Sequence, residues 1–335
     1  MAEEVYTGKT QIIYLVSGTA GFPVFGKGEK VKTVGFIGLG VMGQPMALHL
    51  AQKLPAEAGE LSVYDVDKTK GTAFANVCKA SGATKITLAA DIAEIGQRAD
   101  IVFLSLPTSQ IVRDVILGKG GLAEFLKSGS IIADASTTEV ETVKIAALEL
   151  EKKRIEFADI PVSGGEKAAR EGTLSVMAGG KKEVFDALKP YCDTMAASVV
   201  YMGETGAGQI AKAVNQMIVG AAFAVIAESF SLGVKSGLDP KTLYEAIKGG
   251  WAGSKVLDVA AQDMFSRAFK PGGTVDIHWK DLGYALKLSQ DTDTPVPVTA
   301  LVHEIFKAAR ARGDGKKSQP AVVRLWEDLL DMEVK

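Results

Sequence analysis

An amine inside a long apolar stretch offers proton-transfer chemistry. Lys212 lies in a segment, Gln209 to Lys235, that is rich in Ala, Ile, Val and Phe and is predicted to form one long helix, buried on more than one face. Asn215 and Gln216 follow Lys212 by three and four residues, so a helix points all three side chains the same way. Burial disfavours the charged amine and lowers its pKa toward neutrality. Lys212 is therefore a candidate general acid/base.

A second segment could bind an anion. Ser163, Gly164 and Gly165 follow a predicted strand and offer one hydroxyl and two unencumbered backbone N–H groups. Successive N–H groups of this kind form a small nest suited to a carboxylate. On residue types alone, the same Pro-Val-Ser-Gly-Gly sequence is also common in plain turns.

A glycine-rich turn predicts dinucleotide binding. The strand-like run from Thr33 to Ile37 leads directly into Gly38-Leu-Gly40-Val-Met-Gly43 and then into a helix-compatible run. Gly38 permits the tight turn, Gly40 lets the backbone approach a pyrophosphate, and Gly43 allows the helix to pack closely on the strand. The N-terminus of the helix then faces the phosphates.

An acidic residue after the next strand selects the cofactor. Asp65 ends the predicted strand Leu61–Tyr64. At that place a carboxylate accepts hydrogen bonds from the adenosine ribose hydroxyls and repels a 2′-phosphate. We therefore expect NAD rather than NADP.

These residues need a scaffold of strands and helices. Seven β-branched runs alternate with helical stretches, which predicts a parallel sheet with crossover helices. In such sheets ligands bind at the carboxyl ends of the strands. The expected strands are Thr33–Ile37, Leu61–Tyr64, Ile101–Leu106, Ser130–Ala133, Ile155–Ala158, Leu174–Ala178 and Ser198–Tyr201.

The pattern changes near Gly203, after which no convincing strand is visible. We expect a Rossmann-like doubly wound α/β domain over 31–203 and an all-helical substrate and oligomerisation domain over 204–335, behind an N-terminal extension at 1–30. Beyond the long helix, the expected helices are Pro240–Lys248, Lys255–Phe265, Lys280–Gln290, Val298–Arg312 and Ala321–Met332.

Four ordered motifs resemble the β-hydroxyacid dehydrogenases, a family that includes 3-hydroxyisobutyrate, tartronate semialdehyde and threonate dehydrogenases. They are the glycine fingerprint, Asp159-Ile-Pro-Val-Ser-Gly-Gly, Gly206-Ala-Gly-Gln-Ile-Ala-Lys-Ala-Val-Asn-Gln and Trp279-Lys-Asp-Leu-Gly-Tyr. The resemblance covers Val34 to the C-terminus. It implies NAD(P)-dependent interconversion of a small 3-hydroxy acid and its 3-oxo acid.

The resemblance also implies roles for single residues. The matching lysine, Lys212, is the catalytic residue, and the matching asparagine positions substrate. Strand-end residues at two places and a lysine near the nicotinamide contact the cofactor. The substrate-binding candidates are Ser163, Gly164, Gly165, Asn215 and Gln216; the cofactor-binding candidates are Gly38, Leu39, Gly40, Val41, Met42, Gly43, Asp65, Leu106, Pro107, Thr137 and Lys280.

Composition excludes several classes of function. A net charge of -2 with no long block of like charge argues against nucleic acid. The cysteines Cys78 and Cys192 form no paired motif, and none of the three histidines has a metal-ligand neighbour, so we expect neither disulfides nor a catalytic metal. We also expect no apolar stretch of the ~20 residues that a membrane span needs. We expect a soluble homo-oligomer, dimer or tetramer, in the cytoplasm, with a mitochondrial location left open by the extension at 1–30.

Other readings stay open at this point. A non-catalytic dinucleotide sensor on the same fold has no physical need for a buried amine at Lys212. Imine reductases resemble the family but lack that lysine, and an NADP-dependent semialdehyde or imine reductase is the remaining enzymatic alternative.

The sequence motifs identify the class of the substrate but leave the individual acid open. The segment Gly250-Trp-Ala-Gly-Ser-Lys resembles threonate-type members more than 3-hydroxyisobutyrate ones, and it also fits a plain helix connection. His49 and Ile160 depart from the residues common in the family, and we expect these differences to affect packing or cofactor affinity only.

Overall fold

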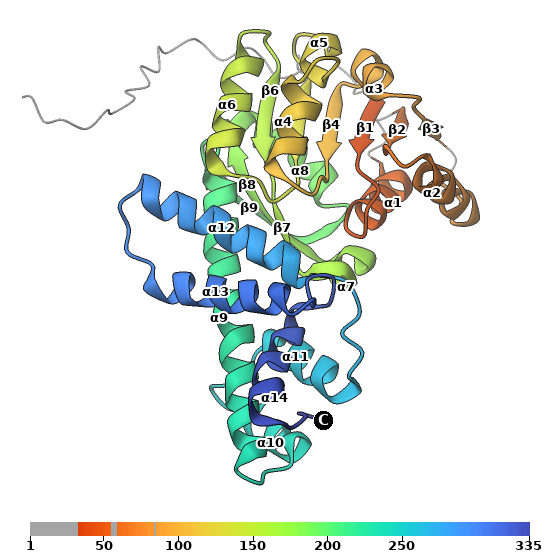
Figure 1. Ribbon diagram of the computed structural model, residues 1–335. Helices are drawn as coiled ribbons and strands as arrows, with labels where there is room; N and C mark the ends of the chain where they lie inside the picture. Colours follow the sequence, from red (N-terminus) through yellow and green to blue (C-terminus); the bar gives the residue numbers. More distant parts are fainter. Residues whose placement is uncertain (1–32, 55–58, 84) are drawn as a thin grey trace, which may run out of the picture.

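The computed structural model describes residues 33–54, 59–83 and 85–335. The extension expected at 1–30 lies outside them. A sheet flanked by helices forms one part of the molecule and a group of helices the other (Figure 1). The predicted fold class, a Rossmann-like domain followed by helices, is confirmed.

The first part of the molecule is built on a nine-stranded sheet with the order β3-β2-β1-β4-β5-β6-β8-β7, in which β9 pairs with β8. All seven expected strands are present, with ends shifted by up to two residues. The strands are β1 (Thr33–Ile37), β2 (Glu60–Tyr64), β3 (Ile86–Leu88), β4 (Ile101–Leu104), β5 (Ile131–Asp134), β6 (Glu156–Asp159), β7 (Val162–Ser163), β8 (Leu174–Gly180) and β9 (Ala196–Gly203).

The sheet differs from the prediction in two ways. It is parallel from β3 to β6, but β8 runs antiparallel to β6 and β7. The period-2 residue pattern is the same for both strand directions, so it could not distinguish them. The strands β3 and β7 were missed, because runs of three and two residues are too short for any pattern.

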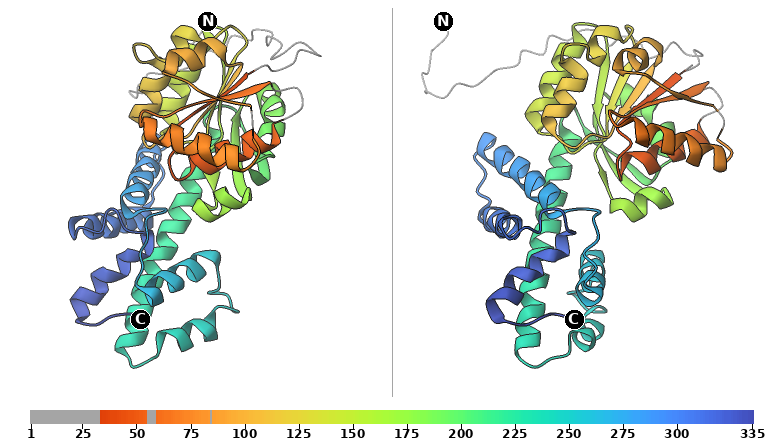
Figure 2. Two further views of the ribbon diagram at one scale, coloured as in Figure 1. Left: turned by 90° about the vertical axis from the view of Figure 1, so that its right-hand side faces the viewer. Right: turned by 45° about the vertical axis from the view of Figure 1, so that its right-hand side comes forward.

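Helices cover both faces of this sheet (Figure 2). One face packs against α1, α2, α7 and α8, and the other against α3 to α6, so two apolar cores enclose the strands. The helices are α1 (Gly43–Lys53), α2 (Lys68–Ala80), α3 (Ile92–Arg98), α4 (Ser109–Leu117), α5 (Leu122–Phe125), α6 (Val140–Glu151), α7 (Gly165–Glu171) and α8 (Lys182–Cys192).

The second part is helical and has its own core. Helix α9 runs from the sheet along the whole length of this part, and α12 and α13 cross it (Figure 1). The elements are α9 (Ala207–Lys235), α10 (Pro240–Ile247), α11 (Lys255–Ser266), α12 (Val275–Asp291), α13 (Pro297–Ala311), the 3-10 turn η1 (Gln319–Val322) and α14 (Val323–Leu330).

Helix α9 corrects two expectations. Its mean hydropathy reaches 1.9, and by length and composition it could cross a membrane, so the apolar stretch judged absent from the sequence exists. Its burial was also overestimated, because a stripe along one side is exposed while the rest packs on β8, α11, α12, α13 and α14. The exposed residues of this α9 stripe are Ile210, Val214, Ile218, Val225 and Leu232.

Helix α12 also differs from the prediction. It begins at Val275, five residues before the expected start at Lys280, because Thr274 caps it by accepting a hydrogen bond from Ile277 N–H. Lys280 therefore lies in the second turn rather than at a solvated helix start. This places its side chain against the sheet domain.

Candidate active site

The glycine turn lies at the point where strand order reverses. β1 lies between β2 and β4, and the loop after it meets the loop after β4. Gly38 has φ +99°, and a Cβ there would come within 2.2 Å of the Ser105 carbonyl oxygen. A Cβ on Gly43 would lie 1.9 Å from the oxygen of Gly38, whereas the space before Gly40 is open. Only glycine fits at positions 38 and 43, whereas the open space at Gly40 leaves room for a ligand.

The start of α1 fits a dinucleotide phosphate. Met42 is its N-cap and makes no side-chain capping hydrogen bond, while Gln44 N–H donates to the Gly40 carbonyl at 2.9 Å. Val41, beside it, is half exposed. A helix start without a side-chain cap and the positive end of the helix dipole together favour an anion here.

Asp65 is bound to this turn. Its Oδ2 accepts a hydrogen bond from Leu39 N–H at 2.8 Å, and its Oδ1 accepts one from Asp67 N–H at 2.9 Å. Lys70 lies 3.5 Å from Oδ1. The carboxylate therefore holds the glycine turn in place and still has acceptor capacity for ribose hydroxyls.

Two further loops meet beside the turn. Leu106 N–H, in the loop after β4 that continues into Pro107, donates to Oγ of Ser136 at 2.8 Å. The carbonyl of Thr137, in the loop after β5, accepts from Nζ of Lys280 at 3.3 Å. The structure thus brings the expected cofactor residues from the ends of β1, β2, β4 and β5 and from α12 to one edge of the sheet.

Lys212 is 7% exposed and lies one turn into α9. Burial lowers the pKa of its amine; the charge of Asp281 raises that pKa, and the charge of Lys280 lowers it further. Burial is the largest of these effects. The environment therefore favours a neutral amine more than water does.

A chain of amide hydrogen bonds lies beside Lys212. Oγ of Ser163 donates to Oδ1 of Asn215 at 3.4 Å, and Nδ2 of Asn215 donates to Oε1 of Gln216 at 2.9 Å. Nε2 of Gln216 donates to Oδ2 of Asp281 at 2.6 Å. The other oxygen of Asp281 lies 3.0 Å from Nζ of Lys280. The predicted substrate residues are thus adjacent, and a carboxylate ends their chain.

His278, on α12, holds the backbone of Gln216 in this chain of hydrogen bonds. Its Nε2–H donates to the Gln216 carbonyl at 3.2 Å, because Nδ1 accepts from Nε2 of Gln319. Burial lowers the pKa of His278 to about 4, so the ring is neutral near pH 7. A Cβ on Gly220 would lie 2.5 Å from Nε2, so only glycine lets the imidazole approach the helix this closely.

The Ser-Gly-Gly loop has the backbone of a nest. Gly164 and Gly165 have φ +129° and +69°, and α7 starts at Gly165. Their amides lead from Ser163 on β7 into the helix, close to the α9 face that carries Asn215. The two departures from the family pattern have packing contacts: His49 bonds to the Arg170 carbonyl, and Ile160 is 1% exposed.

The comparisons with known proteins agree with this geometry. The NAD binding domain of 6-phosphogluconate dehydrogenase matches residues 33–203, and the NAD-binding domain of NADP-dependent 3-hydroxyisobutyrate dehydrogenase matches residues 206–326. The 2-(hydroxymethyl)glutarate dehydrogenase of Eubacterium barkeri is 36% identical over 91% of this chain and 98% of its own length. The chain is a member of the β-hydroxyacid dehydrogenase family.

Two other members of this family are comparably similar. The 2-hydroxy-3-oxopropionate reductase of Escherichia coli is 33% identical over 88% of this chain and 97% of its own length. The mitochondrial 3-hydroxyisobutyrate dehydrogenase of Mus musculus is 35% identical over 86% of this chain and 85% of its own length. The predicted resemblance is confirmed.

Solved structures match both domains together. The 3-hydroxyisobutyrate dehydrogenase of Mycobacterium tuberculosis with L-serine has a TM-score of 0.76 at 26% identity, covering 88% of this chain and 99% of that one. Psf3 in complex with NADP+ and 2-OPP has a TM-score of 0.78 at 26% identity, covering 87% and 99%. The β-hydroxyacid dehydrogenase fold thus extends over nearly all described residues.

Sequence reasoning missed several polar residues around the site. Asp281 and His278 are buried and bond to Gln216, and buried Gln209 bonds to the backbone on both sides of Thr137. Asp281 and Gln209 lie inside motifs that were recognised, and a polar residue on an apolar helix was the available signal. Among the described residues, no group of His, Cys, Asp and Glu could hold a metal ion.

Proposed function

We propose that this β-hydroxyacid dehydrogenase interconverts a small 3-hydroxy acid and its 3-oxo acid, with NAD as cofactor and Lys212 as general acid/base. The observation that carries the proposal is the buried amine of Lys212 between the amide chain and the loop edge that fits a dinucleotide. Ser163, Gly164, Gly165, Asn215 and Gln216 would bind the acid. The bound nicotinamide supplies the acceptor for the hydride.

The residues have separate tasks in this mechanism. Neutral Lys212 takes the proton of the substrate hydroxyl during oxidation and returns it during reduction. The Ser163 hydroxyl and the amides of the nest hold the carboxylate, so the carbon that reacts is fixed relative to the amine. Asp281 orients Gln216 and, through it, Asn215.

The preference for NAD rests on Asp65. Its side chain is 7% exposed, Oδ2 bonds to Leu39 N–H of the glycine turn and Oδ1 bonds to Asp67 N–H, so a 2′-phosphate would meet a fixed negative charge. Lys70 offsets part of that charge. The cofactor residues in this proposal are Gly38, Leu39, Gly40, Val41, Met42, Gly43, Asp65, Leu106, Pro107, Thr137 and Lys280.

The substrate class follows from what the named relatives share. 3-Hydroxyisobutyrate and 2-(hydroxymethyl)glutarate both carry a hydroxymethyl group on the carbon next to a carboxylate, and 2-hydroxy-3-oxopropionate carries the corresponding aldehyde. They differ in the third group on that carbon. We propose a substrate with a carboxylate and a hydroxyl on the 3-carbon, which includes glycerate-like acids and, with a secondary in place of a primary alcohol, threonate-like acids.

Assembly and location belong to the same proposal. The chain divides at 203/204 into a cofactor domain and a helical domain, and the exposed α9 stripe favours a homo-oligomer. We expect no nucleic-acid or membrane partner. A cytoplasmic location is proposed, and a fluorescent fusion of the full chain would distinguish it from the mitochondrial location named for the mouse relative.

The decisive experiment uses a panel of acids and one variant. 3-Hydroxyisobutyrate, glycerate, threonate, 2-(hydroxymethyl)glutarate and L-serine are incubated with NAD, and NADH absorbance is followed. We expect turnover of at least one acid, and a fall in kcat of about 10²–10⁴ in Lys212→Ala, with NAD affinity unchanged. No turnover of any acid, or full turnover in Lys212→Ala, would contradict the proposal.

A further inference from the structure

A buried glutamine joins the cofactor edge of the sheet to the helix that carries Lys212. Gln209 is 2% exposed and lies three residues before Lys212 on α9. Its Oε1 accepts from Thr138 N–H at 2.9 Å, and its Nε2 donates to the Ser136 carbonyl at 2.8 Å. The two bonds enclose Thr137, the residue whose carbonyl also accepts from Lys280.

The backbone of Gln209 is fixed as firmly as its side chain. Its N–H donates to Oδ2 of Asp159 at 2.7 Å, and Gly206 N–H donates to Oδ1 of the same carboxylate at 2.7 Å. A Cβ on Gly208 would lie 2.4 Å from the Met177 carbonyl oxygen, so the helix start lies directly on the strand ends. Gln209 cannot move without moving either α9 or the loop 136–138.

The two bonds need one acceptor and one donor on the same side chain, and the amide of Gln209 supplies both. Thr138 N–H needs an acceptor and the Ser136 carbonyl needs a donor, and both groups are buried. A glutamine side chain supplies both at one length. A thioether of similar length supplies neither, and an ionised carboxylate would turn two acceptors toward each other.

We propose that Gln209 is a positioning residue, which sets the distance between the loop 136–138 at the cofactor edge and the amine of Lys212. This inference rests on the proposed function. Hydride transfer and proton transfer must reach the same substrate carbon and its oxygen together, so a small shift between the two groups slows the reaction strongly, by up to about 10²-fold for ~1 Å.

The first variant removes both bonds. In Gln209→Met we expect kcat to fall at least about tenfold, while KM for the acid changes less than about threefold, because the anion nest is untouched. The kinetic isotope effect with substrate deuterated at the reacting carbon should rise, since hydride transfer becomes more rate-limiting. Gln262→Met makes the same chemical change at an exposed position of α11 and should leave all three values unaltered.

The second variant can make both hydrogen bonds only while its side chain is protonated. A protonated Glu at 209 has a carbonyl that accepts and an O–H that donates, so Gln209→Glu should retain activity at low pH and lose it as the carboxyl ionises. The charged groups nearest to it are Asp134 and Asp159 at the strand ends, which bond to Thr138 and to Gln209 N–H, Lys280 from α12, which bonds to Thr137, and Lys212 three residues further along α9. The ratio of its kcat to that of the unaltered enzyme therefore falls as pH rises, whereas the Gln209→Met ratio stays low and flat.

A third measurement does not depend on catalytic turnover. Hydrogen–deuterium exchange of the Thr138 amide should be faster in Gln209→Met than in the unaltered chain and the Gln262→Met control, because its acceptor is gone. If no acid is oxidised, the proposed function fails, while the exchange measurement still tests the two hydrogen bonds of the Gln209 side chain. Should Lys212→Ala be inactive but Gln209→Met keep kcat within about twofold, or should the Gln209→Glu ratio not change with pH, Gln209 does not position the site. If Gln209→Met fails to fold, the Gln209→Glu profile decides alone.

Discussion

At the scale of single residues, Lys212 is an amine kept out of water with one carboxylate, Asp281, in electrostatic reach. Its pKa is lowered chiefly by burial. Oxidation needs the neutral amine and reduction needs the ammonium, so kcat for oxidation should rise with pH through the lowered pKa, and kcat for reduction should fall. Lys212→Arg should not restore activity, because a guanidinium keeps its proton near neutral pH. Profiles of the two directions that share one slope would contradict this assignment.

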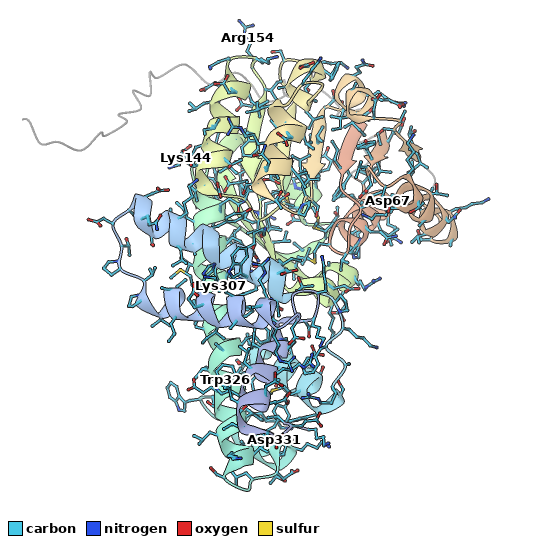
Figure 3. All side chains as sticks on the ribbon, in the orientation of Figure 1. Asp67, Lys144, Arg154, Lys307, Trp326 and Asp331 are labelled. Atoms are coloured by element: carbon cyan, nitrogen blue, oxygen red, sulfur yellow. The ribbon has the colours of Figure 1, made fainter. Side chains whose placement is uncertain are left out.

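Asp65 gives a prediction about cofactor choice. Asp65→Asn keeps the acceptor for Leu39 N–H but removes the negative charge, so the preference for NAD over NADP in kcat/KM should shrink about tenfold or more, as expected when a hydrogen bond to a charged group worth about 1.5–3 kcal/mol is lost. Asp67→Asn, two residues away at the start of α2 (Figure 3), is the matched control and should leave the preference intact. Equal use of both cofactors by the unaltered enzyme would refute the role of Asp65.

Ser163 gives a prediction about the acid. Removing its hydroxyl should weaken kcat/KM for carboxylate substrates by about 1.5–3 kcal/mol, the worth of a hydrogen bond to a charged group. Alcohols without a carboxylate should be poor substrates of both forms. Ser198→Ala, on the exposed edge strand β9, serves as the control. Unchanged kcat/KM for the acid in Ser163→Ala would remove this serine from the site.

At the scale of elements, Asp159 is the cap that fixes the start of α9. Burial raises its pKa to about 7, against the opposing effect of the N–H groups of Gly206 and Gln209. In Asp159→Ala these two buried donors lose their acceptor, at about 1–3 kcal/mol each. We therefore expect the free energy of unfolding, measured by urea denaturation, to fall by about 2–5 kcal/mol.

The pH dependence of this cap has a definite sign. Folding raises the pKa of Asp159 above its value of 3.8 in an exposed carboxyl, so its contribution to stability is greatest at low pH and is lost as pH rises to about 7. Asparagine has no such titration. The stability of Asp159→Asn relative to the unaltered chain should therefore increase between about pH 4 and pH 7. A difference that does not vary with pH would show that this carboxyl does not titrate there.

At the scale of the whole molecule, helix α12 joins the two domains in addition to α9. Lys280, Tyr284 and Lys287 lie on the same face of α12 and contact the sheet domain. Tyr284 Oη accepts from Ser109 N–H at 3.2 Å, and Nζ of Lys287 lies 3.1 Å from Glu139. The two domains therefore meet along α12 as well as through α9, and the site lies between these two helices.

The α9 stripe predicts self-association. Ile218 is 66% exposed and Leu232 67% exposed on a helix that otherwise packs against its own chain. Burying such a stripe against a second copy would be favourable at about 25 cal/mol per Å² of apolar surface. Ile218→Lys should lower the mass measured by light scattering, whereas Val77→Lys, an equivalent change on α2, should not. A monomeric unaltered chain would contradict the oligomer.

Local sequence was sufficient for much of this protein. The glycine turn, the strand-to-helix order and an amine on an apolar helix are encoded within a few neighbouring residues, because turn geometry and side-chain period depend on near neighbours. Positions such as Gly38 and Lys212 could therefore be found without coordinates. The extent of α12 was less accessible, since its start depends on the Thr274 cap.

Only the tertiary structure decides which polar side chains pair with each other and which strands lie side by side. Gln216 meets Asp281, Gln209 meets Ser136 and Thr138, and β8 returns antiparallel, each through contacts between residues far apart in the chain. Residue periodicity tells which face of a helix or strand is apolar, but it does not tell which polar group on another element a buried side chain will meet. The buried hydrogen bonds that order the site depend on how the strands and helices pack together. Burial requires each polar group to find a partner, and packing decides which partner it meets.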